Sequence, residues 1–185
     1  MTSGAPTGIL LSGYFGCGNL GDDLLLSAAV AELRALVPGA HLLVRDGGQL
    51  ARLPHLGSDV ELTGADAILA DRSRPRAWRL VRFIIRMIGQ LRRCEWLVFA
   101  GGTVFHEQNG AHSLMVQWLV CRLARLAGVR IAAIGVGVSD LHSSRARWLM
   151  RDIVGRSDLF LVRDEAGRRQ CGSGAARVTE DLVFG

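Results

Sequence analysis

Three glycine-rich segments of this sequence have residue types that could hold a ligand through backbone atoms. They cover residues 13–23, which read GYFGCGNLGDD, residues 101–103 and residues 135–137. Glycine lets the backbone approach a ligand closely and adopt a positive φ, and a helix that follows a loop presents unpaired N–H groups. Each segment taken alone is equally consistent with a tight turn. A shared ligand site is predicted because all three segments are expected at one edge of the fold.

The first segment contains the spacing G-x-G-x-x-G, at Gly16, Gly18 and Gly21. This spacing is typical of dinucleotide-binding loops, which also need an acidic residue about 20 positions further along the chain to bind a ribose. Asp46 stands near that position, and the neighbouring Arg45 would suit a 2′-phosphate. An NAD(P)-dependent oxidoreductase is therefore one interpretation of the sequence.

Two carboxylates favour a different ligand, because Asp22 and Asp23 directly follow the last glycine of the segment. There they would occupy the positive end of the helix dipole that a pyrophosphate would use. Such a helix start favours a hydroxyl-rich ligand, and we predict a sugar-binding site. The structural alternative is that Asp22 caps the helix and Asp23 complements its dipole. The candidate sugar contacts in this segment are Gly16, Gly18, Asn19, Gly21, Asp22 and Asp23.

The second segment opens a loop over residues 101–110 that adds further candidates. Gly101, Gly102, Thr103 and Glu107 are expected to contact the same ligand. His106 and Glu107, like the two carboxylates of the first segment, are residue types that can carry acid–base chemistry. The sequence alone assigns none of them a catalytic role. They lack the H-E-x-x-H spacing, so no metal site is expected.

The elements that must position these loops follow from the alternation of short apolar runs with helical patterns. This alternation predicts β-α-β units and a parallel sheet, with ligands bound beyond the carboxyl ends of the strands. Strands are expected at residues 8–14, 41–45, 96–100, 129–135, 159–163 and 177–179, and helices at 22–37, 75–93, 111–127, 144–155 and 165–170. A further strand is expected at either 59–62 or 67–70. Arg163 and Asp164, at one strand end, are interpreted as an ion pair.

The composition supports a single globular α/β domain with a Rossmann-like parallel sheet and helices on both faces. Apolar residues make up 49% of the 185 residues and charged residues 21%, a balance that excludes a disordered chain. The four cysteines include no C-x-x-C pair, which argues against a zinc site or a disulfide framework and favours the reducing cytoplasm. No apolar run reaches the length of about 18 residues that a membrane-spanning helix needs.

Basic residues are concentrated in one segment. All 22 basic side chains are arginines, and eight of them fall within residues 72–93 without any acid. One interpretation is an amphipathic helix that rests on an anionic membrane. The other is the solvated outer face of a helix that covers the sheet. Nucleic acid is not an expected partner, because no aromatic stacking pattern accompanies the charge.

The first segment also resembles the opening motif of the polysaccharide pyruvyl transferase family. That motif is an aromatic–glycine pair followed by G-N-x-G-D-E and an apolar helix, and residues 13–26 read GYFGCGNLGDDLLL. Four later segments resemble the family's motifs in the same order, at residues 96–103, 131–137, 161–164 and 179–184. Asp23 replaces the usual glutamate, and Ala100 and Thr103 interrupt the family's run of glycines.

The resemblance implies transfer of a pyruvyl group from phosphoenolpyruvate to two hydroxyls of a sugar, as a ketal, with release of phosphate and no cofactor. The sugar would be nucleotide- or lipid-linked and part of a cell-surface polysaccharide or its precursor, modified at the inner face of the membrane. The fold would resemble the N-terminal lobe of a B-type glycosyltransferase, with the acceptor in that lobe. The residues that bind phosphoenolpyruvate are expected in a second lobe, so residues 1–185 alone are expected to be inactive. The alternative is a sugar-binding lobe without chemistry.

Overall fold

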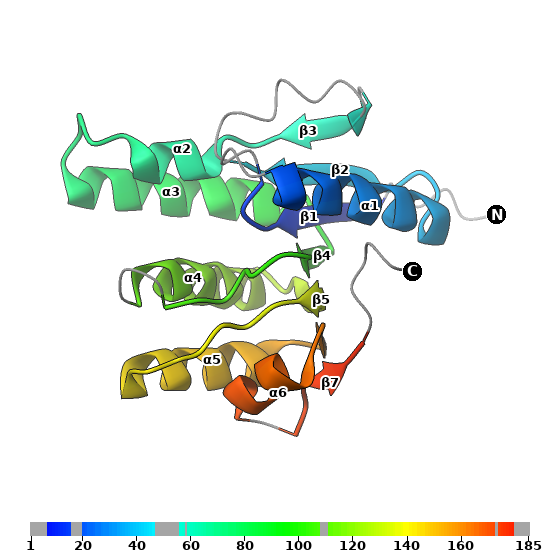
Figure 1. Ribbon diagram of the computed structural model, residues 1–185. Coiled ribbons are helices and arrows are strands. Elements are labelled where there is room, and N and C mark those ends of the chain that lie inside the picture. Colours follow the sequence, from blue (N-terminus) through cyan, green and yellow to red (C-terminus); the bar gives the residue numbers. More distant parts are fainter. Residues whose placement is uncertain are drawn as a thin grey trace.

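A seven-stranded, entirely parallel sheet organises the part of the chain that the structure, a computed structural model, describes (Figure 1). That part comprises residues 7–15, 20–46, 56–57, 59–107, 111–172 and 174–179. The strand order is β3-β2-β1-β4-β5-β6-β7. The strands are β1 (Gly8–Ser12), β2 (His41–Arg45), β3 (Val60–Leu62), β4 (Trp96–Ala100), β5 (Arg130–Val136), β6 (Leu159–Val162) and β7 (Arg177–Val178). The predicted Rossmann-like α/β fold is confirmed.

Helices cover both faces of this sheet, as predicted. The helix α1 (Leu20–Leu36) packs on one face, and the other helices lie on the opposite side (Figure 1). These are α2 (Ala65–Ala70), α3 (Arg76–Leu91), α4 (His112–Leu126), α5 (Ser144–Arg156) and α6 (Glu165–Cys171). The helices α1, α4 and α5 follow strands and run back along the sheet, so their starts lie at its carboxyl edge. The short α2 leads away from β3, and α3 returns beside it (Figure 1).

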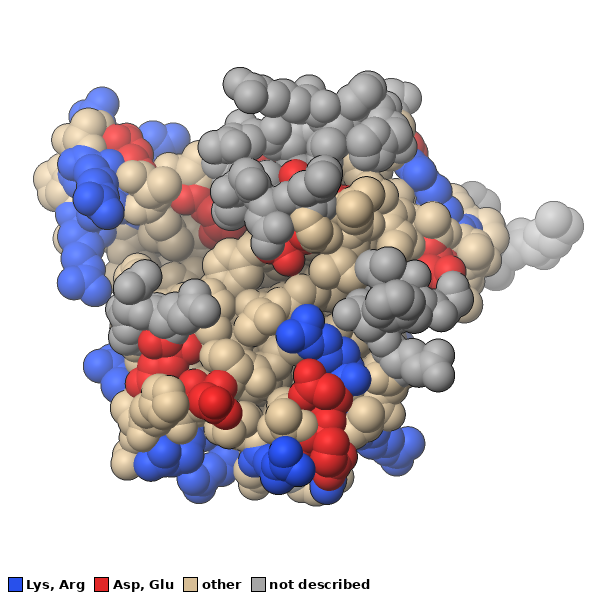
Figure 2. Space-filling model, in the orientation of Figure 1, with Lys and Arg blue, Asp and Glu red and all other residues tan. Residues whose placement is uncertain are grey.

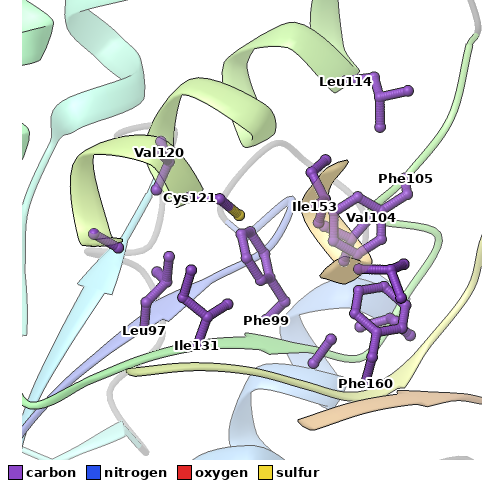
Figure 3. Close-up of a cluster of buried hydrophobic side chains, with 14 of the residues drawn as sticks. Leu97, Phe99, Val104, Phe105, Leu114, Val120, Cys121, Ile131, Ile153 and Phe160 are labelled. Atoms are coloured by element: carbon purple, nitrogen blue, oxygen red, sulfur yellow. The ribbon is translucent and has the colours of Figure 1, made fainter. Parts of the chain in front are cut away.

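The continuous apolar character of the strands reflects burial on both faces. In β1, Leu10 belongs to the core beneath α3, α4 and α5, whereas Ile9 and Leu11 belong to the core beneath α1. In the larger core Phe105 packs at tilted angles against Phe99 and Phe160, with ring centroids 5.2 and 5.6 Å apart (Figure 3). Aromatic contacts of this kind add stability beyond the buried area. They fix the loop after β4 against the sheet.

Residues 59–70, for which the sequence left two possible strands, form one strand and one helix. Residues 60–62 form β3, which pairs in parallel with Leu42, Leu43 and Val44 of β2. The alternative strand at residues 67–70 is wrong, because these residues belong to α2. Alanine and leucine have high helix propensity, and a segment this short gives no clear periodicity. The other predicted elements fall within two residues of their predicted bounds.

No helix in the described part of the chain is long and apolar enough to cross a membrane.

Candidate functional site

The candidate site lies where the winding of the sheet reverses. From β1 the chain moves outward to β2 and β3, and from β4 it moves the other way to β5, β6 and β7. The loops after the neighbouring strands β1 and β4 therefore separate and leave a crevice, the position at which doubly wound folds bind ligands. A pocket of about 400 Å³ lies there. It is lined by Tyr14, Gly21, Asp22, Leu25, Gly102, Thr103, His106 and Arg163.

Two glycines after β4 allow α1 to approach this edge closely. Gly101 and Gly102 have φ of +58° and +61°, values that other residues rarely adopt. A Cβ on Gly101 would lie 2.8 Å from Cβ of Leu25. A Cβ on Gly102 would overlap the carboxylate of Asp22. The first turn of α1 and the loop after β4 thus form one wall of the pocket.

The loops after β4, β5 and β6 meet on the other side of the pocket. The N–H of Gly137 donates to the carbonyl of Gly102 over 2.7 Å. The guanidinium of Arg163 packs on Gly137, where a Cβ would lie 3.0 Å from Cζ, and it donates to Oγ1 of Thr103 over 3.4 Å. Arg163 also pairs with Asp164 at 3.3 Å, which confirms the predicted ion pair. The loops that contain the later two glycine segments therefore lie in contact at this edge of the sheet.

His106 is held in the pocket by its neighbours in the sequence. Phe105 is fully buried and bridges to Val138, and the Glu107 carboxylate is anchored on the other side. Burial lowers the pKa of the imidazole below its usual 6.5, because desolvation disfavours the charged form. Nδ1 is buried and has no hydrogen-bond partner among the described residues. A neutral imidazole in this state can accept a proton from a hydroxyl.

Tyr14 forms the back of the pocket beside this histidine. Its ring lies 5.0 Å from the ring of His106, and its hydroxyl is hydrogen-bonded to the hydroxyl of Ser113 on α4. Burial raises the pKa of the phenol, so the side chain is neutral. The two rings, tilted by 30° to each other, form a partly apolar wall with polar edges.

A buried polar network beneath the pocket uses the residues expected to bind a dinucleotide. Arg45, which is 3% exposed, pairs with Asp66 at 2.9 Å and also donates to Ser12 and Gln117 at 3.0 and 2.8 Å. The Asp46 carboxylate, likewise buried, accepts from the N–H of Gly64 over 2.7 Å. Both side chains therefore stabilise the fold at the ends of β1 and β2. Their geometry counts against the oxidoreductase interpretation.

Glu107 points away from the pocket. Its carboxylate accepts hydrogen bonds from the backbone N–H groups of Ser143 and His142, at 3.0 and 2.6 Å, just before α5. These hydrogen bonds hold the pKa of Glu107 below its ordinary value, and the bond from Ser143 has the largest effect. They satisfy donors at a helix start, which is a structural use of the carboxylate. No cluster of His, Cys, Asp or Glu within the described ranges could hold a metal ion.

Comparison with known families gives a match over nearly the whole chain. The model of the polysaccharide pyruvyl transferase family matches residues 19–185. The chain belongs to this family. The predicted family is thereby confirmed. Among curated proteins no sequence matches.

Four of the predicted ligand contacts line the pocket, namely Gly21, Asp22, Gly102 and Thr103. Gly101 supports the pocket from behind, whereas Asp23 and Glu107 are described but do not line it. The predicted contacts Gly16, Gly18 and Asn19 lie outside the described residues. Asp22 does not precede the helix as a cap, because α1 already begins at Leu20; it lies in the first turn, where it complements the dipole.

The sequence did not point to Tyr14, Leu25 or Arg163 as lining residues. Tyr14 comes two residues after β1 and Arg163 directly after β6, so both stand at carboxyl strand ends. That position was a usable signal, since ligands of this fold bind there. Leu25 has no such signal, because the sequence of an amphipathic helix does not distinguish an apolar residue that lines a pocket from one that packs in the core.

Proposed function

We propose that this polysaccharide pyruvyl transferase family member transfers a pyruvyl group from phosphoenolpyruvate to two hydroxyls of a sugar in a cell-surface polysaccharide or its precursor. The family match over residues 19–185 supports this class of reaction. We propose further that the pocket between β1 and β4 holds the sugar acceptor. The side chains of Asp22, Thr103, Tyr14 and His106 support this assignment, because each can exchange hydrogen bonds with hydroxyls.

Charge favours the acceptor over the donor in this pocket. Phosphoenolpyruvate carries a phosphate and a carboxylate, and such anions are usually bound by several cationic groups. Among the described residues that line the pocket, Arg163 is the cation, and its guanidinium already contacts Asp164 and Thr103. The Asp22 carboxylate would repel the anionic groups of phosphoenolpyruvate. We therefore assign phosphoenolpyruvate to a second lobe of the family's fold.

The chemistry proposed for the pocket is activation of the acceptor hydroxyls. A proton adds to C3 of phosphoenolpyruvate and a sugar oxygen bonds to C2, which gives a phosphorylated ketal. The C2–O bond to phosphate then breaks, and a second hydroxyl oxygen bonds to C2. One hydroxyl proton balances the proton gained by C3, and the other leaves with the phosphate. His106 is the group placed to accept a hydroxyl proton, since its imidazole is neutral.

A transfer assay tests this function. The full protein is incubated with phosphoenolpyruvate labelled in its pyruvyl carbons and with a panel of nucleotide-linked and lipid-linked hexoses. The expected product is a labelled sugar that releases pyruvate under mild acid, formed in equal amount to the phosphate. Phosphate without labelled sugar would make the protein a hydrolase, and sugar binding without either product would leave a non-catalytic lectin-like lobe.

A cofactor titration separates the remaining alternative. If Arg45 and Asp46 serve the fold, neither NAD nor NADP should bind below millimolar concentration in a calorimetric titration. Micromolar binding that is lost in Gly18→Val would favour the oxidoreductase instead.

A further inference from the structure

The helix α3 has an apolar stripe on the side that faces away from the core. Phe83 and Met87 are fully buried against the sheet, as expected for a covering helix. On the opposite side Trp78, Val81 and Ile85 are 39%, 55% and 65% exposed. These three residues recur at steps of three and four, which places them on one face of the helix. The outward side of a covering helix is ordinarily polar, so this stripe requires an explanation.

Arginines flank the stripe. The guanidinium groups of Arg82 and Arg74 lie over the Trp78 ring, 4.7 and 5.3 Å from its centroid. Neither is a member of an ion pair within 4.0 Å among the described residues, although the charge of Arg74 contributes to the lowered pKa of Asp71. The α3 helix contains no acid, and Figure 2 shows arginines gathered at the end of the molecule where α2 and α3 meet. We call Arg74, Trp78, Val81, Arg82 and Ile85 the outer face of α3.

A hollow beside this face has the charge of a phosphate site. It has a volume of about 350 Å³ and lies between α3 and the start of α2, lined by Thr63, Gly64, Ile68, Arg82, Ile85 and Arg86. No acidic side chain is among these lining residues. Arg86 is oriented there by a hydrogen bond of 3.1 Å to the carbonyl of Thr63. Two guanidinium groups beside a backbone turn would bind the phosphate of a headgroup.

We propose that the outer face of α3 binds the surface of an anionic phospholipid membrane. Trp78, Val81 and Ile85 would enter the boundary between headgroups and acyl chains, and Arg82 and Arg86 would contact lipid phosphates in the hollow. An amphipathic helix with arginines beside exposed tryptophan and aliphatic side chains has the chemistry of an interfacial helix. Val81 and Ile85 would not contribute to binding of a nucleic acid. The apolar residues of this face therefore favour lipid over nucleic acid as its partner.

This contact would place the proposed acceptor pocket near the membrane. Arg76, at the start of α3, and His112, at the start of α4, line one pocket, so α3 begins on the side of the sheet that carries the candidate site. A lipid-linked sugar would then reach Asp22 from the membrane surface, a consequence that rests on the proposed function. Vesicle binding itself does not rest on it and is measured without phosphoenolpyruvate or sugar.

Co-sedimentation of the full protein with vesicles tests the inference. Binding is expected to vesicles of phosphatidylcholine with about 30 mol% phosphatidylglycerol, and it should weaken about tenfold or more without the anionic lipid. Each arginine at such a surface contributes about fivefold, so R74Q/R82Q should weaken partitioning about 25-fold. V81S/I85S should weaken it about tenfold or more through lost apolar burial.

The matched control is W148S/R145Q on α5, which removes an exposed tryptophan and an exposed arginine from another helix. It should bind within about twofold of the unmodified protein, and circular dichroism should show all variants folded. The inference is overturned if the unmodified protein does not sediment with anionic vesicles, or if the α5 control loses binding equally. Tight binding to duplex DNA without vesicle binding would also overturn it, in favour of a nucleic-acid surface.

Discussion

The carboxylate of Asp22 lies against the backbone of Gly102, in the space that a Cβ at that position would occupy. This contact joins the first turn of α1 to the loop after β4, which are 80 positions apart in the sequence. It explains why a glycine stands at residue 102, and it places the carboxylate at the wall of the pocket.

Substitution of Gly102 should therefore be costly. Gly102→Ala combines a φ of +61° with overlap of the Asp22 carboxylate, and we expect it to lower the free energy of unfolding by more than about 1 kcal/mol. Gly89→Ala is the control, because Gly89 lies in α3 without a positive φ and a Cβ there would meet no atom within 4 Å. It should raise stability by about 0.5–1 kcal/mol. Equal effects of the two substitutions in denaturant titrations would refute the proposed contact.

The buried Arg45 network should contribute far more to stability than an exposed ion pair. Arg45→Met leaves Asp66, Ser12 and Gln117 without their shared donor, and we expect a loss of about 3 kcal/mol. In the control, Arg34→Met breaks a pair with Asp59 that is exposed on both sides, and stability should hardly change. Urea unfolding of both variants provides the comparison. A tolerated Arg45→Met would show that Arg45 is free to serve a ligand.

The role of His106 should appear in the pH dependence of activity. Because burial lowers its pKa, the imidazole stays neutral down to a pH below 6.5, and kcat/KM should fall only as the pH drops through that lowered pKa. His106→Asn should reduce kcat by about 10²–10⁴ and remove this acidic limb. The control is His112→Asn, at an exposed position at the start of α4, and it should retain both the kcat and the acidic limb of the unmodified protein. An unchanged acidic limb in His106→Asn would assign the proton transfer to another group.

The sheet and its glycine loops could be predicted from the sequence because their signals are local. Apolar runs that end in glycine mark β1, β4 and β5 and the loops that follow them. The choice between residues 59–62 and 67–70 could not be made, since both segments are short and apolar in part. Only the pairing of β3 with β2 decides it.

The functions of individual polar residues depended on contacts between distant segments. Glu107 was expected to bind the ligand, but its carboxylate accepts from Ser143, 36 positions further along. Arg163 was interpreted only as the partner of Asp164, whereas it also reaches Thr103, 60 positions away. Neither of these two contacts could be predicted from the local sequence. The contact between α1 and the loop after β4 likewise becomes visible only when Gly102 is seen beside Asp22.

The most direct test of the acceptor pocket is the kinetics of Asp22→Asn, measured with the full protein and the acceptor found in the transfer assay. If the carboxylate binds acceptor hydroxyls, loss of its charge should raise the acceptor KM at least about tenfold, equivalent to about 1.4 kcal/mol. The KM for phosphoenolpyruvate should stay within about twofold. Glu32→Gln, at an exposed position of the same helix, should change neither value. An unchanged acceptor KM in Asp22→Asn, or a rise in the phosphoenolpyruvate KM instead, would contradict the assignment of this pocket to the sugar.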